Sequence, residues 1–312
     1  MVQTMSGPVD VNELGLTLMH EHIIFDFNEA KRVPAIELSV RLLKEAATAG
    51  VRSLVDLTPF RKVDWLQEIA ARVPEVNVIL CTGNYLERMM PEHVRALSED
   101  DMYARFVREL TEGIDGSGVK AGIIKVAANK PEMTEWEKRV FRAAARAHRQ
   151  TGAPIATHAC SGARAQMDYL VEQGVDPSRV FFSHVEAEFG WEGRSLVEEA
   201  QYLLEIAQAG GWLLFNNFGF EWDTPWPDLV FLLKHLMAQG RRDRILTSVD
   251  ANWRWNDDGE VEWEAERSHP ETARRTYAYM ITEAVPELKK AGFSYDDVDA
   301  FLVANPRLYF SI

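Results

Sequence analysis

The sequence has too few cysteines for a disulfide-rich protein and too little positive charge for a protein that binds nucleic acid or anionic membranes. Its 312 residues include two cysteines, Cys81 and Cys160, too few for a disulfide framework or a clustered cysteine metal site. Their apolar neighbours predict buried free thiols in a reducing compartment. The formal net charge of −14 argues against nucleic acid and anionic membrane surfaces as partners, because both favour basic patches.

Long hydrophobic runs are also missing. No run approaches the roughly 18 to 20 apolar residues of a membrane span. Residues 1–7 lack the basic patch and apolar stretch of a signal peptide, so we expect a cytoplasmic protein. With 46% hydrophobic residues the chain can fill a large core. No linker, low-complexity tract or repeat divides it, and we expect a single domain over residues 1–312.

The chain alternates short apolar runs with longer amphipathic patterns. Eight runs are apolar on both sides and rich in Val, Ile, Leu and Phe, as parallel strands buried on both faces are. Helical spacing of apolar residues is clearest over 195–209, 135–150 and 40–49, and each pattern stops close to a glycine. The strand-like runs are 16–24, 53–57, 76–81, 121–126, 154–158, 180–184, 212–216 and 245–249.

Eight strands alternating with helices predict an α/β fold, a closed (β/α)8 TIM barrel. The structural alternative is an open doubly wound sheet, in which a glycine-rich phosphate-binding sequence is expected. The chain has no G-x-G-x-x-G after the first run and no G-x-x-x-x-G-K-[ST] anywhere, which favours the barrel.

The first run contains a His-Glu-His triplet. Side chains alternate faces along a strand, so we expect His20 and His22 to point one way and Glu21 the other. Two neighbouring imidazoles suit a metal ion that takes nitrogen ligands. By itself the triplet has an ordinary alternative, because histidines at this spacing also form simple hydrogen bonds.

Four later residues strengthen the metal interpretation, because catalytic groups of such barrels come from the C-terminal ends of strands. His158, His184 and Asp250 end the fifth, sixth and eighth runs, although a single strand-end histidine is more often structural and an aspartate can cap a turn. Lys125 lies inside the fourth run, where an unpaired ammonium would be buried at large cost. A carbamate made from that amine and carbon dioxide would instead be an oxygen donor able to bridge two metal ions.

In these residues and their surroundings the sequence resembles the phosphotriesterase-like branch of the amidohydrolase superfamily, over about residues 6–312. The ordered combination of matching stretches is far more specific than any one of them. They are Gly-Pro-Val at 7–9, Leu-Gly-Leu-Thr-Leu-Met-His-Glu-His at 14–22, Gly-Asn-Tyr at 83–85, Ala-Gly-Ile-Ile-Lys-Val at 121–126, Thr-His at 157–158, Ser-His at 183–184, Ser-Val-Asp at 248–250 and Asn-Pro-Arg at 305–307.

The resemblance implies a homodimer of barrels, each with two divalent metal ions, usually zinc, with Mn2+, Co2+ or Fe2+ as alternatives. A carbamylated Lys125 would bridge the two ions together with a hydroxide. By the same analogy, the ligands of the buried ion are His20, His22 and Asp250. Those of the more exposed ion are His158 and His184.

Family members hydrolyse lactones, organophosphate triesters, carboxylic esters or, in some branches, amides and phosphorylated sugar lactones. We expect a binuclear-metal hydrolase that uses the bridging hydroxide on a lactone or a carboxylic ester. Two metal ions make hydroxide available at neutral pH, and Asp250 can pass its proton to the leaving group. The alternatives are a phosphotriester or amide hydrolase and, from another class, a catalytically silent barrel that binds a ligand.

The loops after the strands should bind the substrate. Tyr85 matches a position where lactonases of the family carry a tyrosine beside the metals. Asn217 stands roughly where the lactonase pattern has an arginine, which is a departure from the family. We also expect substrate contacts from Trp253 and Arg254, after the eighth run.

Two of these loops are rich in aromatic residues, which line a pocket, form a subunit interface or pack within the loops. The segment 251–269 is also acidic, so a neutral ester or lactone fits better than a strongly anionic phosphate. The aromatic residues are Phe218, Phe220, Trp222, Trp226, Trp253, Trp255 and Trp263.

Overall fold

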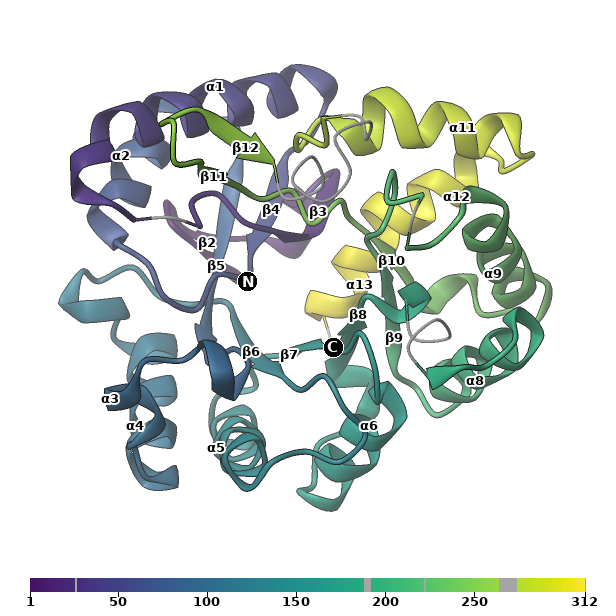
Figure 1. Cartoon of the computed structure of the whole chain (residues 1–312), viewed down its shortest axis with the longest axis horizontal. Coiled ribbons are helices and arrows are strands. Elements are labelled where there is room, and N and C mark those ends of the chain that lie inside the picture. Colours follow the sequence, from purple (N-terminus) through teal and green to yellow (C-terminus); the bar gives the residue numbers. More distant parts are fainter. Residues whose placement is uncertain (26, 188–191, 222, 264–273, 312) are drawn as a thin grey trace.

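Eight parallel strands form a nearly closed barrel in the computed structural model of the chain, which describes residues 1–25, 27–187, 192–221, 223–263 and 274–311 (Figure 1). The strands are hydrogen-bonded in chain order, so the predicted (β/α)8 barrel is confirmed, with strand ends moved by a few residues. They are β3 (Thr17–Glu21), β4 (Ser53–Asp56), β5 (Asn77–Gly83), β6 (Ile123–Ala127), β7 (Ile155–His158), β8 (Val180–Ser183), β9 (Trp212–Phe215) and β10 (Ile245–Thr247).

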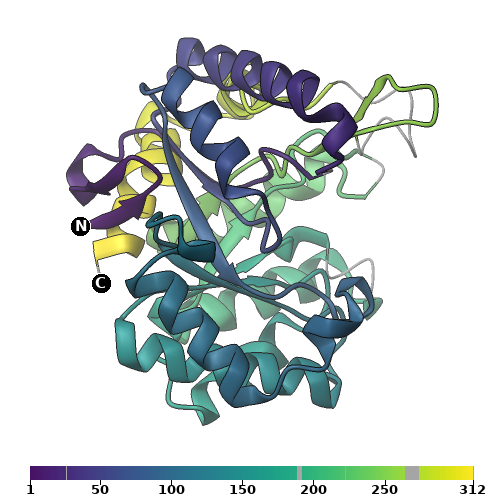
Figure 2. The same ribbon diagram turned by 90° about the vertical axis from the view of Figure 1, so that its left-hand side faces the viewer.

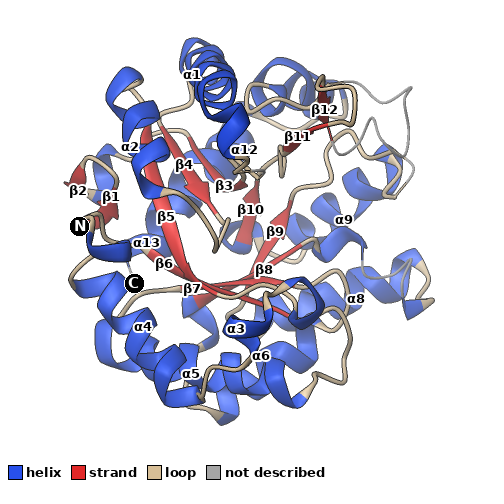
Figure 3. Cartoon of the chain, turned by 60° about the vertical axis from the view of Figure 1, so that its left-hand side comes forward, coloured by secondary structure: helices blue, strands red, loops and turns tan. Residues whose placement is uncertain are grey.

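Helices surround the strands on the outside (Figure 3). Among the described residues, none of these helices combines the length and apolar character that crossing a membrane requires. Their bounds are α1 (Arg32–Ala49), α2 (Val63–Arg72), α3 (Glu92–Arg95), α4 (Glu99–Thr111), α5 (Glu135–Thr151), α6 (Ala163–Glu172), α8 (Leu196–Gln208), α9 (Trp226–Ala238), α11 (Val285–Lys290), α12 (Tyr295–Asp299) and α13 (Asn305–Ser311).

The three helices predicted most clearly are present, with ends set by local chemistry. Helix α8 begins after Ser195, whose hydroxyl accepts the backbone N–H of Glu198 in a reciprocal capping box. Helix α5 ends at Gly152, which is left-handed with φ 74°. Helix α1 begins at Arg32 rather than at residue 40, because Pro34 falls in its first turn, where the missing N–H leaves no hydrogen bond unmade.

Inward-pointing strand residues fill the barrel, and its N-terminal end is closed by both chain termini (Figure 2). Val2 of β1 (Val2–Thr4), which pairs with β2 (Gly7–Val9), packs into this interior cluster. Tyr309 of α13 joins the cluster and donates its hydroxyl to the carbonyl of Ile155 at 2.7 Å. The opposite, C-terminal end of the barrel is left for polar side chains.

Hydrogen bonds between β3 and the segment after β10 bring the two edges of the barrel together. The backbone N–H of Asp250 donates to the His20 carbonyl at 3.1 Å. The Glu21 carboxylate accepts from Ser248 Oγ at 2.7 Å and from the Ala251 N–H at 2.6 Å. Burial raises the pKa of Glu21 to about 7. Glu21 therefore points away from the two histidines, as predicted, and ties the barrel edges together.

Gly83 ends β5 at a point where the neighbouring strand leaves no room for a side chain. Its φ is +122°, and an added Cβ would lie 1.9 Å from the carbonyl oxygen of Lys125. We expect Gly83→Ala to lower the free energy of unfolding by about 3 kcal/mol or more, from backbone strain and overpacking together. Urea unfolding measures this loss.

Gly152→Ala is the matched control, because its φ is +74° and nothing lies within 4 Å of an added Cβ. It should lose only about 1 to 2 kcal/mol, from the left-handed backbone alone. Equal losses in the two variants would contradict the steric argument at Gly83.

Candidate active site

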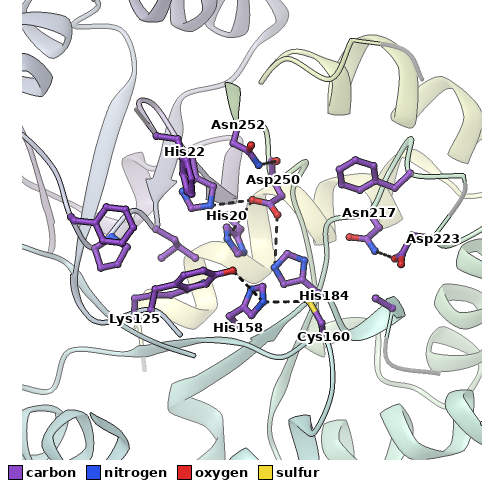
Figure 4. Close-up of a pocket in the computed structure, with 17 residues that line it drawn as sticks. His20, His22, Lys125, His158, Cys160, His184, Asn217, Asp223, Asp250 and Asn252 are labelled. Carbon is purple, nitrogen blue, oxygen red and sulfur yellow. Dashed lines mark hydrogen bonds and ion pairs between the residues drawn. The ribbon is translucent and has the colours of Figure 1, made fainter. Parts of the chain in front are cut away.

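The six side chains predicted from the sequence meet at the C-terminal end of the barrel (Figure 4). They line one cavity of about 280 Å³, although they come from five different strand ends. Lys125 and His20 are each only 1% exposed. The residues brought together are His20, His22, Lys125, His158, His184 and Asp250.

The carboxylate of Asp250 lies at the centre of the histidines. Its Oδ1 is 3.5 Å from Nε2 of His20 and 3.2 Å from Nε2 of His22, while its Oδ2 is 3.8 Å from Nε2 of His184. Both Asp250 and His184 have positive φ, of 55° and 63°. That conformation is costly for residues other than glycine, and it turns both side chains into the cavity directly after their strands.

The second nitrogen of three histidine rings contacts a polar group that fixes the ring. The hydroxyls beside His20 and His22 can accept the ring N–H, as the outer partners of metal-binding histidines do, which leaves the other nitrogen free to face the site. At His184 the partner is an amide N–H, which donates to the ring and holds its orientation. The contacts join His20 Nδ1 to Ser183 Oγ at 2.9 Å, His22 Nδ1 to Thr58 Oγ1 at 2.7 Å, and His184 Nδ1 to Asn216 Nδ2 at 2.8 Å.

The pKa values favour the forms that bind cations. Burial lowers the pKa of His20 and of His158 well below its usual range, and lowers that of His184 to about 4. Burial would raise the pKa of Asp250, but the charges of the neighbouring histidines hold it well below its usual range. Burial also acts to lower the pKa of His22, yet the hydrogen bond and charge of Asp250 raise it.

The environment of Lys125 indicates that these residues suit a pair of cations. Its Nζ has no hydrogen-bond partner among the described residues, and burial lowers its pKa to about 8. The lowered pKa makes the neutral form of this amine more accessible, and that form can react with carbon dioxide. The product would replace a buried amine that has no hydrogen-bond partner among the described residues with a metal-binding anion. The donor set also fits, because the ligand atoms of His20, His184 and Asp250 all lie within 4.8 Å of one another.

A buried carboxylate supports the loop after β9. Glu186 accepts the backbone N–H groups of Asn216 and Asn217, both at 2.5 Å. Burial raises the pKa of Glu186 to about 8. Asn216 in turn accepts the backbone N–H of His184 at 2.9 Å, so Glu186 helps to position that ring through Asn216.

Two of the four predicted substrate-binding residues lie in the cavity and two do not. Tyr85 lines it with its hydroxyl 3.4 Å from Nε2 of His158, and Asn217 lines it as well. Trp253 and Arg254 belong to a hairpin of β11 (Trp253–Trp255) and β12 (Val261–Trp263) that lies outside it.

The packing of the hairpin explains the positions of these two residues, and their contact with a substrate stays a prediction. Trp253 is buried against the core and opposite Trp263, whereas Arg254 points to the other face and donates to Glu262 at 2.9 Å. Of the loop aromatics, Phe220 lines the cavity. Trp222 and residues 264–269 of the acidic segment lie outside the described residues.

Sequence reasoning missed several residues of the cavity. Cys160 was predicted to be a buried thiol like Cys81, yet it is half-buried and lines the cavity. Its position two residues after His158 was the available signal. Asp223 and Asn252 lie several residues beyond the ends of β9 and β10 in the sequence. Phe25 and Phe60 lie in loops that contain no recognisable motif. All five line the cavity.

Comparison with known proteins agrees with this architecture. The chain matches the phosphotriesterase family over residues 1–310. It is 32% identical to a phosphotriesterase homology protein of Mycobacterium tuberculosis, over 99% of this chain and 97% of the relative. It is 26% identical to an aryldialkylphosphatase of Saccharolobus solfataricus, over 97% of each chain.

A solved structure is similar to this chain over nearly its whole length. That structure comes from the molecular engineering of organophosphate hydrolysis activity from a weak promiscuous lactonase template. Its TM-score is 0.87 and its sequence identity is 27%, over 99% of this chain and 100% of that one. The fold and the site thus define a metal-dependent hydrolase that acts on small molecules. The chain belongs to the phosphotriesterase family.

Proposed function

We propose that the protein hydrolyses a lactone or a carboxylic ester at a binuclear metal centre. The observation that carries the proposal is the single cavity in which four histidines, an aspartate and an orphaned lysine amine meet. The buried ion would be held by His20, His22 and Asp250. The more exposed ion would be held by His158 and His184, and a carbamylated Lys125 would bridge the two.

Bound divalent ions, of which zinc is our first expectation, activate water at neutral pH and polarise the carbonyl oxygen of a substrate. The chain supplies the proton transfer and the orientation. The Asp250 carboxylate is ionised and lies among the metal-facing nitrogens, so it can accept a proton and deliver it to the leaving alcohol. Tyr85, whose hydroxyl faces His158, can donate a hydrogen bond to the substrate from the cavity wall.

The lining supports a neutral substrate. Its apolar part comprises Phe25, Leu57, Pro59, Phe60, Ala187 and Phe220. Lys125 is the only lysine or arginine among the described lining residues, and Asp223 adds a carboxylate on the side of Asn217. An apolar wall with few polar groups suits a ring or an acyl chain, and the lactonase template of the similar solved structure agrees with this choice.

Phosphotriester hydrolysis is the second candidate, favoured by the aryldialkylphosphatase relative. A purified, metal-loaded enzyme should be assayed against acyl lactones, aryl esters, N-acyl amino acids and neutral phosphotriesters. We expect the highest kcat/KM for lactones or esters. If only a triester turns over efficiently, the second candidate is correct. Turnover of none of them, with metal bound, would favour the silent barrel.

Asp223 gives a sharper test of the preference for neutral substrates. We expect Asp223→Asn to raise kcat/KM for a lactone that carries a carboxylate, relative to its neutral analogue, by about 30-fold. The reason is that a unit charge roughly 8 Å away contributes about 2 kcal/mol at an effective dielectric constant near 20. The ratio of the two kcat/KM values measures the change.

Asp257→Asn makes the same change of charge at an exposed position outside the cavity, and it should leave the ratio unchanged. An unaltered ratio in Asp223→Asn would mean that this carboxylate does not face the substrate. The homodimer and the cytoplasmic location expected from the sequence stay predictions, which light scattering and cell fractionation test.

A further inference from the structure

Cys160 presents a thiol to the cavity directly beside a predicted metal-binding histidine (Figure 4). Its Sγ lies 3.4 Å from Nε2 of His158. Metal–sulfur and metal–nitrogen bonds of about 2.3 and 2.0 Å place the two donors roughly 3.5 Å apart in a tetrahedral site. The observed separation of 3.4 Å therefore fits two donors that share one ion.

A third donor completes this group. The ligand atoms of His158, Cys160 and His184 all lie within 4.8 Å of one another. The rings of the two histidines meet edge to face, with centroids 4.5 Å apart. Imidazole and thiolate are both zinc ligands, and a fourth position remains for the bridging group or the substrate.

The backbone that carries the thiol is held from both sides. The N–H of Ala159 donates to the Ser183 carbonyl at 3.2 Å. After the cysteine, Ser161 Oγ and the Gly162 N–H both donate to Oε1 of Glu192, at 2.6 and 2.8 Å. The turn after β7 is thus fixed in the position that directs the thiol into the cavity.

A second observation in the same cavity points independently to a missing cation-binding partner. The Lys125 amine is 1% exposed, lines this cavity and has no hydrogen-bond partner among the described residues. A bridging carbamate there would join an ion at His20, His22 and Asp250 to a second ion on the side of His158. Cys160 lies on that second side.

We propose that Cys160, as a thiolate, binds the same divalent ion as His158 and His184. The inference rests on the binuclear centre proposed above and adds a ligand to it. On binding, the thiol releases its proton to solvent and its sulfur becomes a soft, anionic donor. Such a donor favours Zn2+ and Co2+ over Mn2+ at this position. It also reduces the positive charge that the ion offers to a substrate oxygen.

The test uses Co2+ in place of the native metal, because a cobalt–thiolate bond gives a sulfur-to-metal charge-transfer band in the near ultraviolet. Metal-free full-length protein is reconstituted with Co2+ and bicarbonate, and the bound cobalt is counted by elemental analysis. We expect the band in the wild type, its loss in Cys160→Ser, and its retention in Cys81→Ala. In Cys160→Ser, competition between Zn2+ and Mn2+ should also shift towards Mn2+.

The outcomes separate the inference from the function on which it rests. Two bound cobalt ions and ester turnover without the band would mean that the thiol only hydrogen-bonds to His158, which overturns the inference and leaves the hydrolase intact. A band that survives in Cys160→Ser but disappears in Cys81→Ala would overturn it as well. Protein that binds no cobalt would overturn both the ligand and the binuclear centre.

Discussion

Lys125→Met is expected to remove nearly all hydrolytic activity while making the metal-free protein more stable. The change shortens the unbranched side chain by one atom and removes the amine that would carry the bridging carbamate. Loss of an outer partner of a metal ligand already costs about 10- to 100-fold, so loss of a shared ligand should lower kcat/KM by more than about 100-fold. Kinetic assays on the best lactone or ester, with the metal content measured, give this value.

The stability change has the opposite sign for a physical reason. The amine is buried and no described residue gives it a hydrogen bond, so replacing it with a thioether removes a desolvation penalty of about 1 to 3 kcal/mol. We therefore expect a higher urea midpoint for metal-free Lys125→Met than for the metal-free wild type. Added metal should stabilise the wild type far more than the variant, because the variant binds it weakly.

Two further variants sharpen this prediction. Lys44→Met changes an exposed lysine of α1 and should leave activity unchanged. Lys125→Ala leaves space for a small carboxylate, so added propionate should restore part of its activity if an oxygen-donor anion is what the site needs. Wild-type turnover by Lys125→Met on every substrate would show that the lysine has no part in the reaction.

Asp250→Asn is expected to lower kcat by about 10²- to 10⁴-fold, the usual contribution of a positioned proton-transfer group. Asparagine is the right replacement because residue 250 has a φ of 55°, and asparagine adopts left-handed backbone more readily than most residues. An alanine there would combine backbone strain with loss of the carboxylate. Unfolding curves should therefore change little in the asparagine variant.

The leaving group shows whether the proton transfer or only metal binding is lost. An alkoxide needs a proton as it departs, whereas a nitrophenoxide does not. The defect should be much larger for alkyl esters than for p-nitrophenyl esters at equal metal content. Asp115→Asn is the matched control, since Asp115 also has a positive φ, of 50°, and lies outside the cavity. Equal defects on both kinds of ester would contradict a proton-transfer role for Asp250.

The main ligand candidates could be found in the sequence because each follows or lies in an apolar strand. Parallel strands end at one edge, so His158, His184 and Asp250 had to lie near one another once the barrel was recognised. Lys125 was informative for a different reason, since an amine inside a buried strand has no structural explanation of its own. The structure agrees with both arguments.

Other parts of the site depend on loop paths that no periodicity encodes. Trp253 and Arg254 follow β10 closely, yet the hairpin that contains them folds back on itself and turns them away from the cavity. Cys160 has an apolar neighbourhood in the sequence, but the turn held by Glu192 directs it into the cavity. The positive φ of His184 and Asp250, which aims both side chains, also has no signature in the sequence.

The sequence by itself determined the barrel and the rim at which polar groups meet, because hydrophobic periodicity sets where strands begin and end. Only the tertiary structure decided which loop residues join that rim. Left-handed backbone at two strand ends, a shift of register within β3 and the Glu186 support under Asn216 each depend on contacts between distant segments. Such contacts form only when the barrel closes, so they fix the distances within the site that a linear pattern does not contain.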